Sequence, residues 1–340
     1  MARLREVGKW AGIIVAAVVI LGCIAPYAVP VAKYDPAAVN SPFKNGRFTG
    51  VDGVRLHYRY WEPTAEPAKG NVVLIHGFCG STFSWRKNID AIRNAGYRIT
   101  ALDLPAFGYS DRIHGIYQSP RERAKMVWDF LSTIEKRHFP KTEHPKWVLV
   151  GHSMGGGVIA AMAQVAPERT DSLIFVDGAV FNHGGQASTG SGLARGAMDS
   201  VLSFPPVVRW VEVIAKYRLF TQDHIKGLLT SAYAQPADDD AVKGYLAALQ
   251  VPGTARAVLA HMRDMGKPDG LDASTIQAPC LLIWGDEDTW VPLRAGERLR
   301  DTLPHAQWHV IPGAGHCSME THPDAFNSLV VNFLKERAAA

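Results

Sequence analysis

Three separated residues of this sequence, a serine, a histidine and an aspartate, could act together in nucleophilic catalysis. Ser153 stands in the stretch Gly151-His152-Ser153-Met154-Gly155. A serine hydroxyl is a weak nucleophile at neutral pH, so it needs a base, here His316, to accept its proton during attack and return it to the leaving group. A carboxylate, which we assign to Asp288, would hold the imidazole tautomer and stabilise the imidazolium. These residue types predict acyl transfer through an acyl-enzyme on Ser153.

The residues around Ser153 predict a strand, a sharp turn and a helix. Four apolar residues, 147–150, precede Gly151, and a helical pattern continues to Pro167. A nucleophile at such a turn has a strained backbone, so the residues two before and two after it must lack side chains, as Gly151 and Gly155 do. A phosphate-binding loop is the alternative, but no Lys-Ser/Thr pair follows the glycines. The serine interpretation is therefore preferred.

The acid and the base stand on loops that follow two late apolar segments. Asp288 lies in residues 285–292, and His316 ends Pro312-Gly313-Ala314-Gly315-His316. Both loops leave the carboxyl ends of predicted strands, where open α/β sheets place their sites. Asp286 competes with Asp288 as the acid, and Asp177, after an earlier strand, is a third candidate.

Two backbone N–H groups are candidates for an oxyanion hole. Negative charge develops on the carbonyl oxygen during attack, so donors must face it. Met154 directly follows the nucleophile, and Phe78 follows His76-Gly77 at the end of a predicted strand. We expect the N–H groups of Met154 and Phe78 to be these donors, and His76 to shape the loop rather than act as a base.

The elements that must position these residues alternate between strands and helices. Residues 47–61 alternate in polarity around Asp52-Gly53, which predicts a hairpin, and Ser119-Pro120 is a typical helix start. Trp85 to Asn94 is a plausible helix. Buried strands are predicted at 71–76, 97–104, 147–150, 172–176, 279–284 and 308–311. This order predicts an α/β fold with a mostly parallel sheet flanked by helices.

The alternation stops after residue 180, where a Gly/Ser-rich stretch, 184–192, precedes helical patterns. The segment from residue 181 to residue 271 is too long for a loop, so we expect it to form a helical cap. Its predicted helices are Pro206 to Tyr217, Asp223 to Ala232 and Asp239 to Leu249. The domain organisation predicted is a membrane segment (1–32), a linker (33–46), a first core part (47–180), the cap (181–271) and a second core part (272–337).

The amino terminus predicts attachment to a membrane. Basic residues (Arg3, Arg5 and Lys9) precede a run without charge, residues 10–32. About 20 apolar residues span a bilayer, and the flanking charge predicts a cytoplasmic amino terminus with the catalytic domain exported, to the periplasm or the extracellular side. Three interpretations remain: a retained signal anchor, which we prefer, a secretory peptide cleaved near Pro26, and lipoprotein processing at Cys23.

The composition argues against other classes of protein. The net charge is only +4 in 340 residues, so nucleic-acid binding has no support. The four cysteines have no metal-ligand spacing, and we expect neither a cofactor nor a metal. We expect the loops of Cys79 and Cys317 to lie close in space, and unpaired thiols are preferred over a disulfide. The oligomeric state is not predicted.

Together these motifs resemble the α/β-hydrolase superfamily over residues 47–337. The resemblance rests on residues 76–78, 103–110, 151–156, 285–288 with 291–292, and 315–316. It implies an α/β-hydrolase fold with the triad Ser153, Asp288 and His316. Ala106 departs from the glycine that is usual in the family, at a structural turn. Dehalogenases and epoxide hydrolases of the superfamily carry aspartate at the elbow, so Ser153 argues against them. The membrane segment with Gly-His-Ser-Met-Gly-Gly resembles membrane-anchored and monoacylglycerol-lipase-like esterases.

The expected function is that of a membrane-associated serine hydrolase. Its partners would be a fairly apolar carboxylic ester and, through the amino-terminal segment, membrane lipid. The same triad could cleave an amide, a thioester or a C–C bond beside a carbonyl, or transfer the acyl group to an acceptor other than water. A sensor that keeps the pocket without turnover is the alternative from another class, because fold alone does not settle function.

Overall fold

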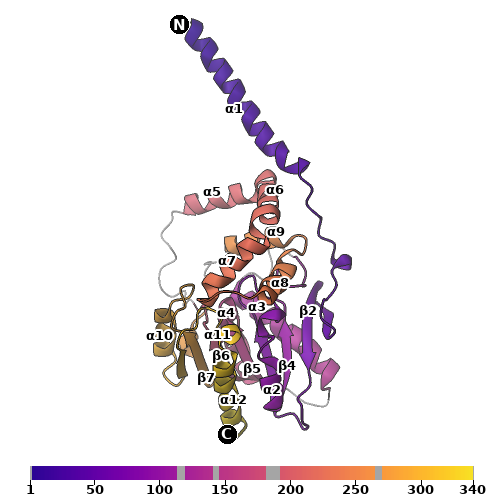
Figure 1. The fold of residues 1–340 in the computed structure, drawn as a ribbon, viewed down its shortest axis with the longest axis vertical. Helices are drawn as coiled ribbons and strands as arrows, with labels where there is room; N and C mark the ends of the chain where they lie inside the picture. The colour runs from indigo at the N-terminus through magenta and orange to yellow at the C-terminus, as the bar shows by residue number, and fades with distance from the viewer. Residues whose placement is uncertain (1, 113–118, 141–144, 181–191, 265–269, 340) are drawn as a thin grey trace.

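The computed structural model describes residues 2–112, 119–140, 145–180, 192–264 and 270–339. Its centre is an eight-stranded sheet in the order β1-β2-β4-β3-β5-β6-β7-β8 (Figure 1). The strands β1 and β2 form the expected antiparallel hairpin, β2 pairs antiparallel with β4, and the pairs from β4 to β8 are parallel. The strands are β1 (Gly46–Val51), β2 (Val54–Trp61), β3 (Gly70–Ile75), β4 (Tyr97–Leu102), β5 (Trp147–His152), β6 (Thr170–Val176), β7 (Cys280–Gly285) and β8 (Gln307–Ile311).

Helices cover both faces of the sheet because its parallel strands are apolar on both sides. On β3, Val73 and Ile75 face one core and Val72 and Leu74 the other. The first core contains side chains of α3 (Pro120–His138), α4 (Met154–Val165) and α10 (Leu293–Thr302), and the second those of α2 (Ile89–Asn94) and α12 (Pro323–Ala339). The expected α/β fold is confirmed.

The helix expected over residues 85–94 forms only from Ile89 onward. The structure has a 3₁₀ turn, η2 (Thr82–Trp85), followed by the short α2. Between them Asn88 is buried and donates from its amide to Met319 O and to Asn327 Oδ1. These tertiary contacts hold the chain where periodicity alone would continue a helix. Further short turns are η1 (Pro36–Ala38), η3 (Pro167–Arg169), η5 (Ala273–Thr275) and the one-turn α11 (Ser318–Thr321).

Between β6 and β7 the described residues form helices, which we call the cap. They are α5 (Gly192–Ser203), α6 (Pro205–Ile214), the π-helical turn η4 (Ala215–Leu219), α7 (Gln222–Tyr233), α8 (Asp239–Leu249) and α9 (Thr254–Asp264). The helix expected up to residue 217 ends three residues earlier, and α9 was not predicted. The stretch expected at 184–192 lies, up to residue 191, outside the described residues.

The amino-terminal helix α1 (Ala2–Ala28) projects from the end of the molecule that carries α5 and α6 (Figure 1). Its segment Trp10–Ala28 is long and apolar enough to cross a membrane, and only 6% of the most apolar part is buried in the protein. A signal sequence would pass the same test. The segment from Val29 to β1 then connects α1 to the sheet.

Candidate active site

Ser153 occupies a strained turn between β5 and α4. Its backbone has φ +49° and ψ −119°, a conformation that residues other than glycine rarely adopt. The chain is fixed on both sides of this turn, because Ser153 N–H donates to Val176 O (3.0 Å) and Ser153 O accepts from the N–H groups of Gly156 and Ala179 (both 2.8 Å). The backbone around the hydroxyl is therefore pre-organised.

The glycines around Ser153 are required by close approach of the backbone. A Cβ on Gly151 would lie 2.4 Å from Gly155 O, and one on Gly155 would lie 2.4 Å from Ile75 O. A Cβ on Gly77 would lie 3.0 Å from Ser153 Cβ, so the loop after β3 directly adjoins the nucleophile. The steric reason predicted for residues 151 and 155 is thus present.

His316 is held from several sides. Its Nδ1 bonds Asp288 Oδ2 at 2.7 Å, and its backbone N–H donates to Ala232 O of α7 at 2.6 Å. The ring stacks against Trp290 with centroids 5.7 Å apart. Since Nδ1 is engaged by Asp288, Nε2 is the nitrogen left to exchange a proton. The link from His316 to Ser153 Oγ is not among the hydrogen bonds between described residues; such links often tighten only when substrate binds.

Of the three candidate acids, the structure pairs Asp288 with His316. The other oxygen of Asp288, Oδ1, accepts the backbone N–H groups of Trp290 (2.8 Å) and Val291 (2.9 Å), so this carboxylate is fully bonded. Asp286 instead accepts from Gly313 N–H in the neighbouring turn. Its place there is structural.

Asp177 lies beneath the site and braces its loops. It is fully buried and accepts from Gly285 N–H (2.8 Å), where the Asp288 loop begins, and from Ser318 Oγ (2.9 Å), just after His316. Burial, followed by the nearby negative charge of Asp288, raises the pKa of Asp177 well above its usual value.

The two expected oxyanion donors lie on opposite sides of Ser153. Met154 begins α4, where the first N–H groups have no helical acceptor, and Phe78 follows Gly77 on the adjoining loop. Neither N–H donates to an acceptor among the described residues. His76 behaves as expected: its Nδ1–H donates to Gly77 O (2.7 Å), and its Nε2 accepts from Leu104 N–H (3.0 Å). Burial lowers the pKa of His76, so it stays neutral and shapes this loop.

His152 and Trp290 contact the site but had no role in the sequence argument. His152 donates from Nε2 to the backbone O of His316 (2.8 Å), and burial lowers its pKa well below the usual value. Its place directly before Ser153 was the available signal. The structure also stacks the ring of Trp290 on the imidazole of His316.

Glu320 was also missed, and it joins the cap to the core beside the histidine loop. This buried carboxylate accepts hydrogen bonds from Tyr233 of α7 (2.8 Å) and Tyr245 of α8 (2.5 Å), and pairs with Arg86 after η2. Side chains from four separate parts of the chain thus meet at the carboxylate of Glu320. Nothing in the local sequence around residue 320 reveals these distant partners.

Cofactor sites are not evident in the part of the chain that the structure describes. No group of three His, Cys, Asp or Glu residues there could hold a metal ion. All four cysteines are free, so Cys79 and Cys317 do not pair. Burial raises the pKa of both thiols.

The sequence is similar to one protein family and to several known hydrolases. Residues 72–329 match the model of the alpha/beta hydrolase family, well over half of the chain. The "uncharacterized hydrolase YugF" of Bacillus subtilis is 28% identical over 291 residues, covering 85% of this chain and 97% of that protein. A 2-hydroxy-6-oxononadienedioate/2-hydroxy-6-oxononatrienedioate hydrolase of Paraburkholderia phymatum is 28% identical over 311 residues, covering 87% and 96%.

Solved structures share the fold. An esterase from Exiguobacterium antarcticum aligns with a TM-score of 0.63 at 17% identity, covering 85% of this chain and 99% of its own. A membrane phospholipase A, described as a bacterial virulence factor, aligns with a TM-score of 0.64 at 24% identity over 100% of both chains. With the family match and the hydrolase relatives, the conclusion is direct: the chain belongs to the alpha/beta hydrolase family and is a hydrolase.

Proposed function

We propose that this hydrolase cleaves a fairly apolar carboxylic ester through an acyl-enzyme on Ser153. The observation that carries the proposal is the hydrogen bond of 2.7 Å between His316 and Asp288 at the sheet edge that also presents Ser153. Ester cleavage is supported by the apolar helix α1, which would hold the enzyme where apolar esters are concentrated.

Each residue has one role in the proposed reaction. Ser153 Oγ attacks the ester carbonyl carbon while His316 Nε2 takes its proton. The N–H groups of Phe78 and Met154 stabilise the oxyanion, each contributing about 3–4 kcal/mol. The tetrahedral intermediate expels the alkoxide, which His316 protonates. Water then attacks the acyl-enzyme by the same route, giving the carboxylic acid and free Ser153, while Asp288 stabilises the imidazolium in both halves.

A second candidate is hydrolysis of a C–C bond beside a carbonyl. The observation that favours it is the name of the relatives, several of which are 2-hydroxy-6-oxononadienedioate/2-hydroxy-6-oxononatrienedioate hydrolases. Those substrates are dicarboxylates. An apolar ester and a dianion make opposite demands on the pocket, so one enzyme is not expected to process both efficiently.

We also propose that α1 is a retained signal anchor and that residues 181–271 form a cap over the core. The catalytic domain would then lie on the exported side, joined to the anchor by residues 33–46. Membrane fractionation and the mass of the mature amino terminus test the anchor. An intact Met1 in the membrane fraction supports it; a chain that begins at an acylated Cys23 would indicate lipoprotein processing instead.

The function is tested with a substrate panel on detergent-solubilised full-length protein. The panel contains p-nitrophenyl esters of increasing acyl length, a matched amide and thioester, and 2-hydroxy-6-oxononadienedioate (the dienedioate), the compound named for the relatives. Wild type, Ser153→Ala and His316→Ala are compared. A higher turnover of the longer esters by wild type, together with loss of ester turnover in both variants, supports the proposal. Turnover of the dienedioate above every ester would favour the second candidate, and no turnover of any substrate by folded wild type would favour a sensor.

A further inference from the structure

The helix α1 contains Pro26, which leaves one backbone carbonyl inside the helix without a helical donor. In an α-helix the N–H of each residue donates to the carbonyl four residues earlier, and proline has no N–H. Pro26 therefore frees the carbonyl of Gly22, and the carbonyl of Pro26 is free because it lies in the last turn of α1. Within a bilayer no water can satisfy such groups, so each costs several kcal/mol unless another part of the protein donates to it.

Both carbonyls are bound by neighbouring residues of the cap helix α6. Trp210 donates from its indole Nε1 to Gly22 O at 2.8 Å, and Arg209 donates from Nε to Pro26 O at 3.2 Å. Arg209 also donates to Val29 O (2.7 Å), and Lys216 of η4 donates to Pro30 O (2.8 Å), both just after α1 ends. The cap thus supplies the donor that Pro26 removes and further donors at the end of α1, so α6 is fixed against α1.

The depth of this contact follows from helix geometry. The apolar segment Trp10–Ala28 has 19 residues, which at 1.5 Å per residue gives about 28 Å, close to the hydrocarbon thickness of a bilayer. Ala28 then lies near one boundary of the hydrocarbon, and Gly22, six residues earlier, lies about 9 Å inside it. The indole of Trp210 must reach that depth, whereas Arg209 and Lys216 bond carbonyls at the level of the headgroups.

The cap surface beside this contact is unusually apolar for a face in water. On α5 and at the start of α6, Met198, Val201 and Phe204 are 58%, 54% and 49% exposed. On α6 and η4, Ile214 and Tyr217 are 46% and 49% exposed. In Figure 1, α5 and α6 lie at the same end of the molecule, where α1 leaves it. Contiguous exposed apolar residues of this kind mark an interaction surface.

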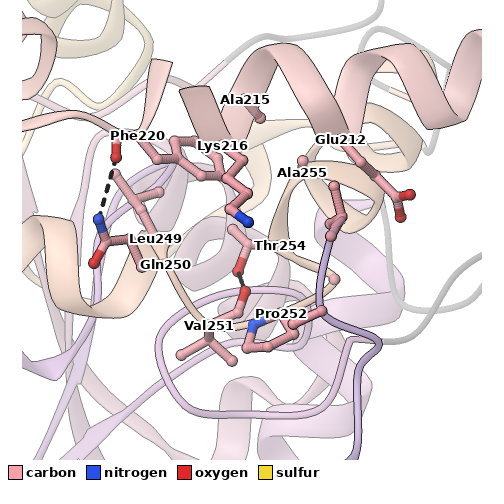
Figure 2. A pocket seen from close by; sticks show the side chains of 13 residues that line it. Glu212, Ala215, Lys216, Phe220, Leu249, Gln250, Val251, Pro252, Thr254 and Ala255 are labelled. Carbon is pink, nitrogen blue, oxygen red and sulfur yellow. Dashed lines mark hydrogen bonds between the residues drawn. The ribbon is translucent and has the colours of Figure 1, made fainter. Parts of the chain in front are cut away.

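A cavity lies directly behind this contact. About 360 Å³ in volume, it is lined by Val31 and Ala32 after α1 and by residues of α6, η4, α8 and 251–255 (Figure 2). None of the catalytic candidates lines it. The cap and the segment after α1 therefore do not pack tightly against each other at this point, so their contact depends on the hydrogen bonds of Arg209, Trp210 and Lys216.

We infer that the cap face formed by Met198, Val201, Phe204, Trp210, Ile214 and Tyr217 is seated in the interface of the lipid bilayer, held there by the donors of α6 on the carbonyl freed by Pro26 and on the last turn of α1. The inference rests on the proposed retention of α1 as an anchor. Each aromatic or aliphatic side chain of this face enters the acyl boundary, and the cations of α6 and η4 remain at the phosphates, as in interfacial helices. The cap, and not only the anchor, then meets the leaflet that contains the substrate.

Photo-crosslinking of the full chain in phosphatidylcholine/phosphatidylglycerol nanodiscs tests the inference. Benzoylphenylalanine replaces Phe204 on the cap face, Val18 in α1, or Val310 on the edge strand β8 as an exposed apolar control. Lipid adducts at the first two positions and not at the third are expected. An adduct at Val18 without one at Phe204 would overturn the inference and leave the anchor intact. No adduct at Val18 would overturn the anchor, and the inference with it.

A double-mutant cycle tests the freed carbonyl itself. Trp210→Phe keeps the ring and removes the donor, and Pro26→Ala restores the helical N–H to Gly22 O. In the nanodisc, Trp210→Phe should lower both the unfolding temperature and the lipid crosslinking at Phe204, and it should do so much less in the Pro26→Ala background. Equal effects in the two backgrounds would overturn the role of the freed carbonyl.

Discussion

Replacing Asp288 by asparagine should disable the enzyme without unfolding it. Three donors face this carboxylate: His316 Nδ1–H, and the N–H groups of Trp290 and Val291. A carboxamide has one oxygen, so its NH₂ must face either the two backbone donors or the imidazole. If it faces the imidazole, Nδ1 must accept, the proton moves to Nε2, and His316 can no longer take the proton of Ser153. We expect kcat to fall about 10³–10⁴-fold, or about 4–5.5 kcal/mol.

Asp177→Asn is the matched control, because it makes the same chemical change in a neighbouring buried carboxyl. Its amide oxygen can accept from Gly285 N–H, and its NH₂ can donate to Ser318 Oγ, so these two hydrogen bonds can be kept. Loss of kcat should stay below about tenfold, or 1.4 kcal/mol.

The assay is steady-state hydrolysis of a p-nitrophenyl ester, with circular dichroism to show that both variants are folded. A loss below tenfold for Asp288→Asn, together with a loss above a thousandfold for folded Asp177→Asn, would refute the assignment of Asp288 and identify Asp177 as the acid.

Three further changes test the scaffold. Ala106→Gly should stabilise the protein by about 1 kcal/mol in urea unfolding, because Ala106 has φ +77° and glycine avoids this strain; a loss of stability would contradict this. Glu320→Gln should destabilise by about 2 kcal/mol, since the half-buried Arg86 loses its closest counter-charge and keeps only the exposed Asp240, 3.7 Å away; an unchanged urea midpoint would show that the pair contributes little. Burial alone would raise the pKa of Asp103, but His57 and backbone donors hold this pKa below its usual value. The ionised Asp103 therefore stabilises the folded state above about pH 3.9, and this contribution is lost as the pH falls through the pKa of the folded protein. Asp103→Asn should therefore lose less stability than wild type between pH 5 and 3, and parallel profiles would argue against this role.

Local signals in the sequence predicted much of the architecture. The Asp52-Gly53 turn, the alternating apolar strands and the start of α3 depend on neighbouring residues. Ser119 accepts from Glu122 N–H in a capping box with Pro120 in the first turn, so this boundary could be found locally. The motifs around residues 153, 288 and 316 could likewise be placed at one sheet edge, because the carboxyl ends of parallel strands meet there.

Features that depend on distant partners were not predictable. The partners of Glu320 come from α7, α8 and the segment after η2, and periodicity does not reveal such pairs. The break at Asn88 has the same cause. Pro26 removes a helical N–H donor wherever it stands inside a helix, but only the structure shows that Trp210, 188 residues away in the chain, donates to the freed carbonyl.

The most direct test of the central claim is covalent labelling of full-length protein with a fluorophosphonate, followed by peptide mass spectrometry. An activated serine attacks the phosphorus, so the account predicts one adduct on the peptide that contains Ser153, no adduct in Ser153→Ala, and much slower labelling in His316→Ala and Asp288→Asn. An adduct on another serine, or labelling of Ser153 that is equally fast without His316, would contradict it.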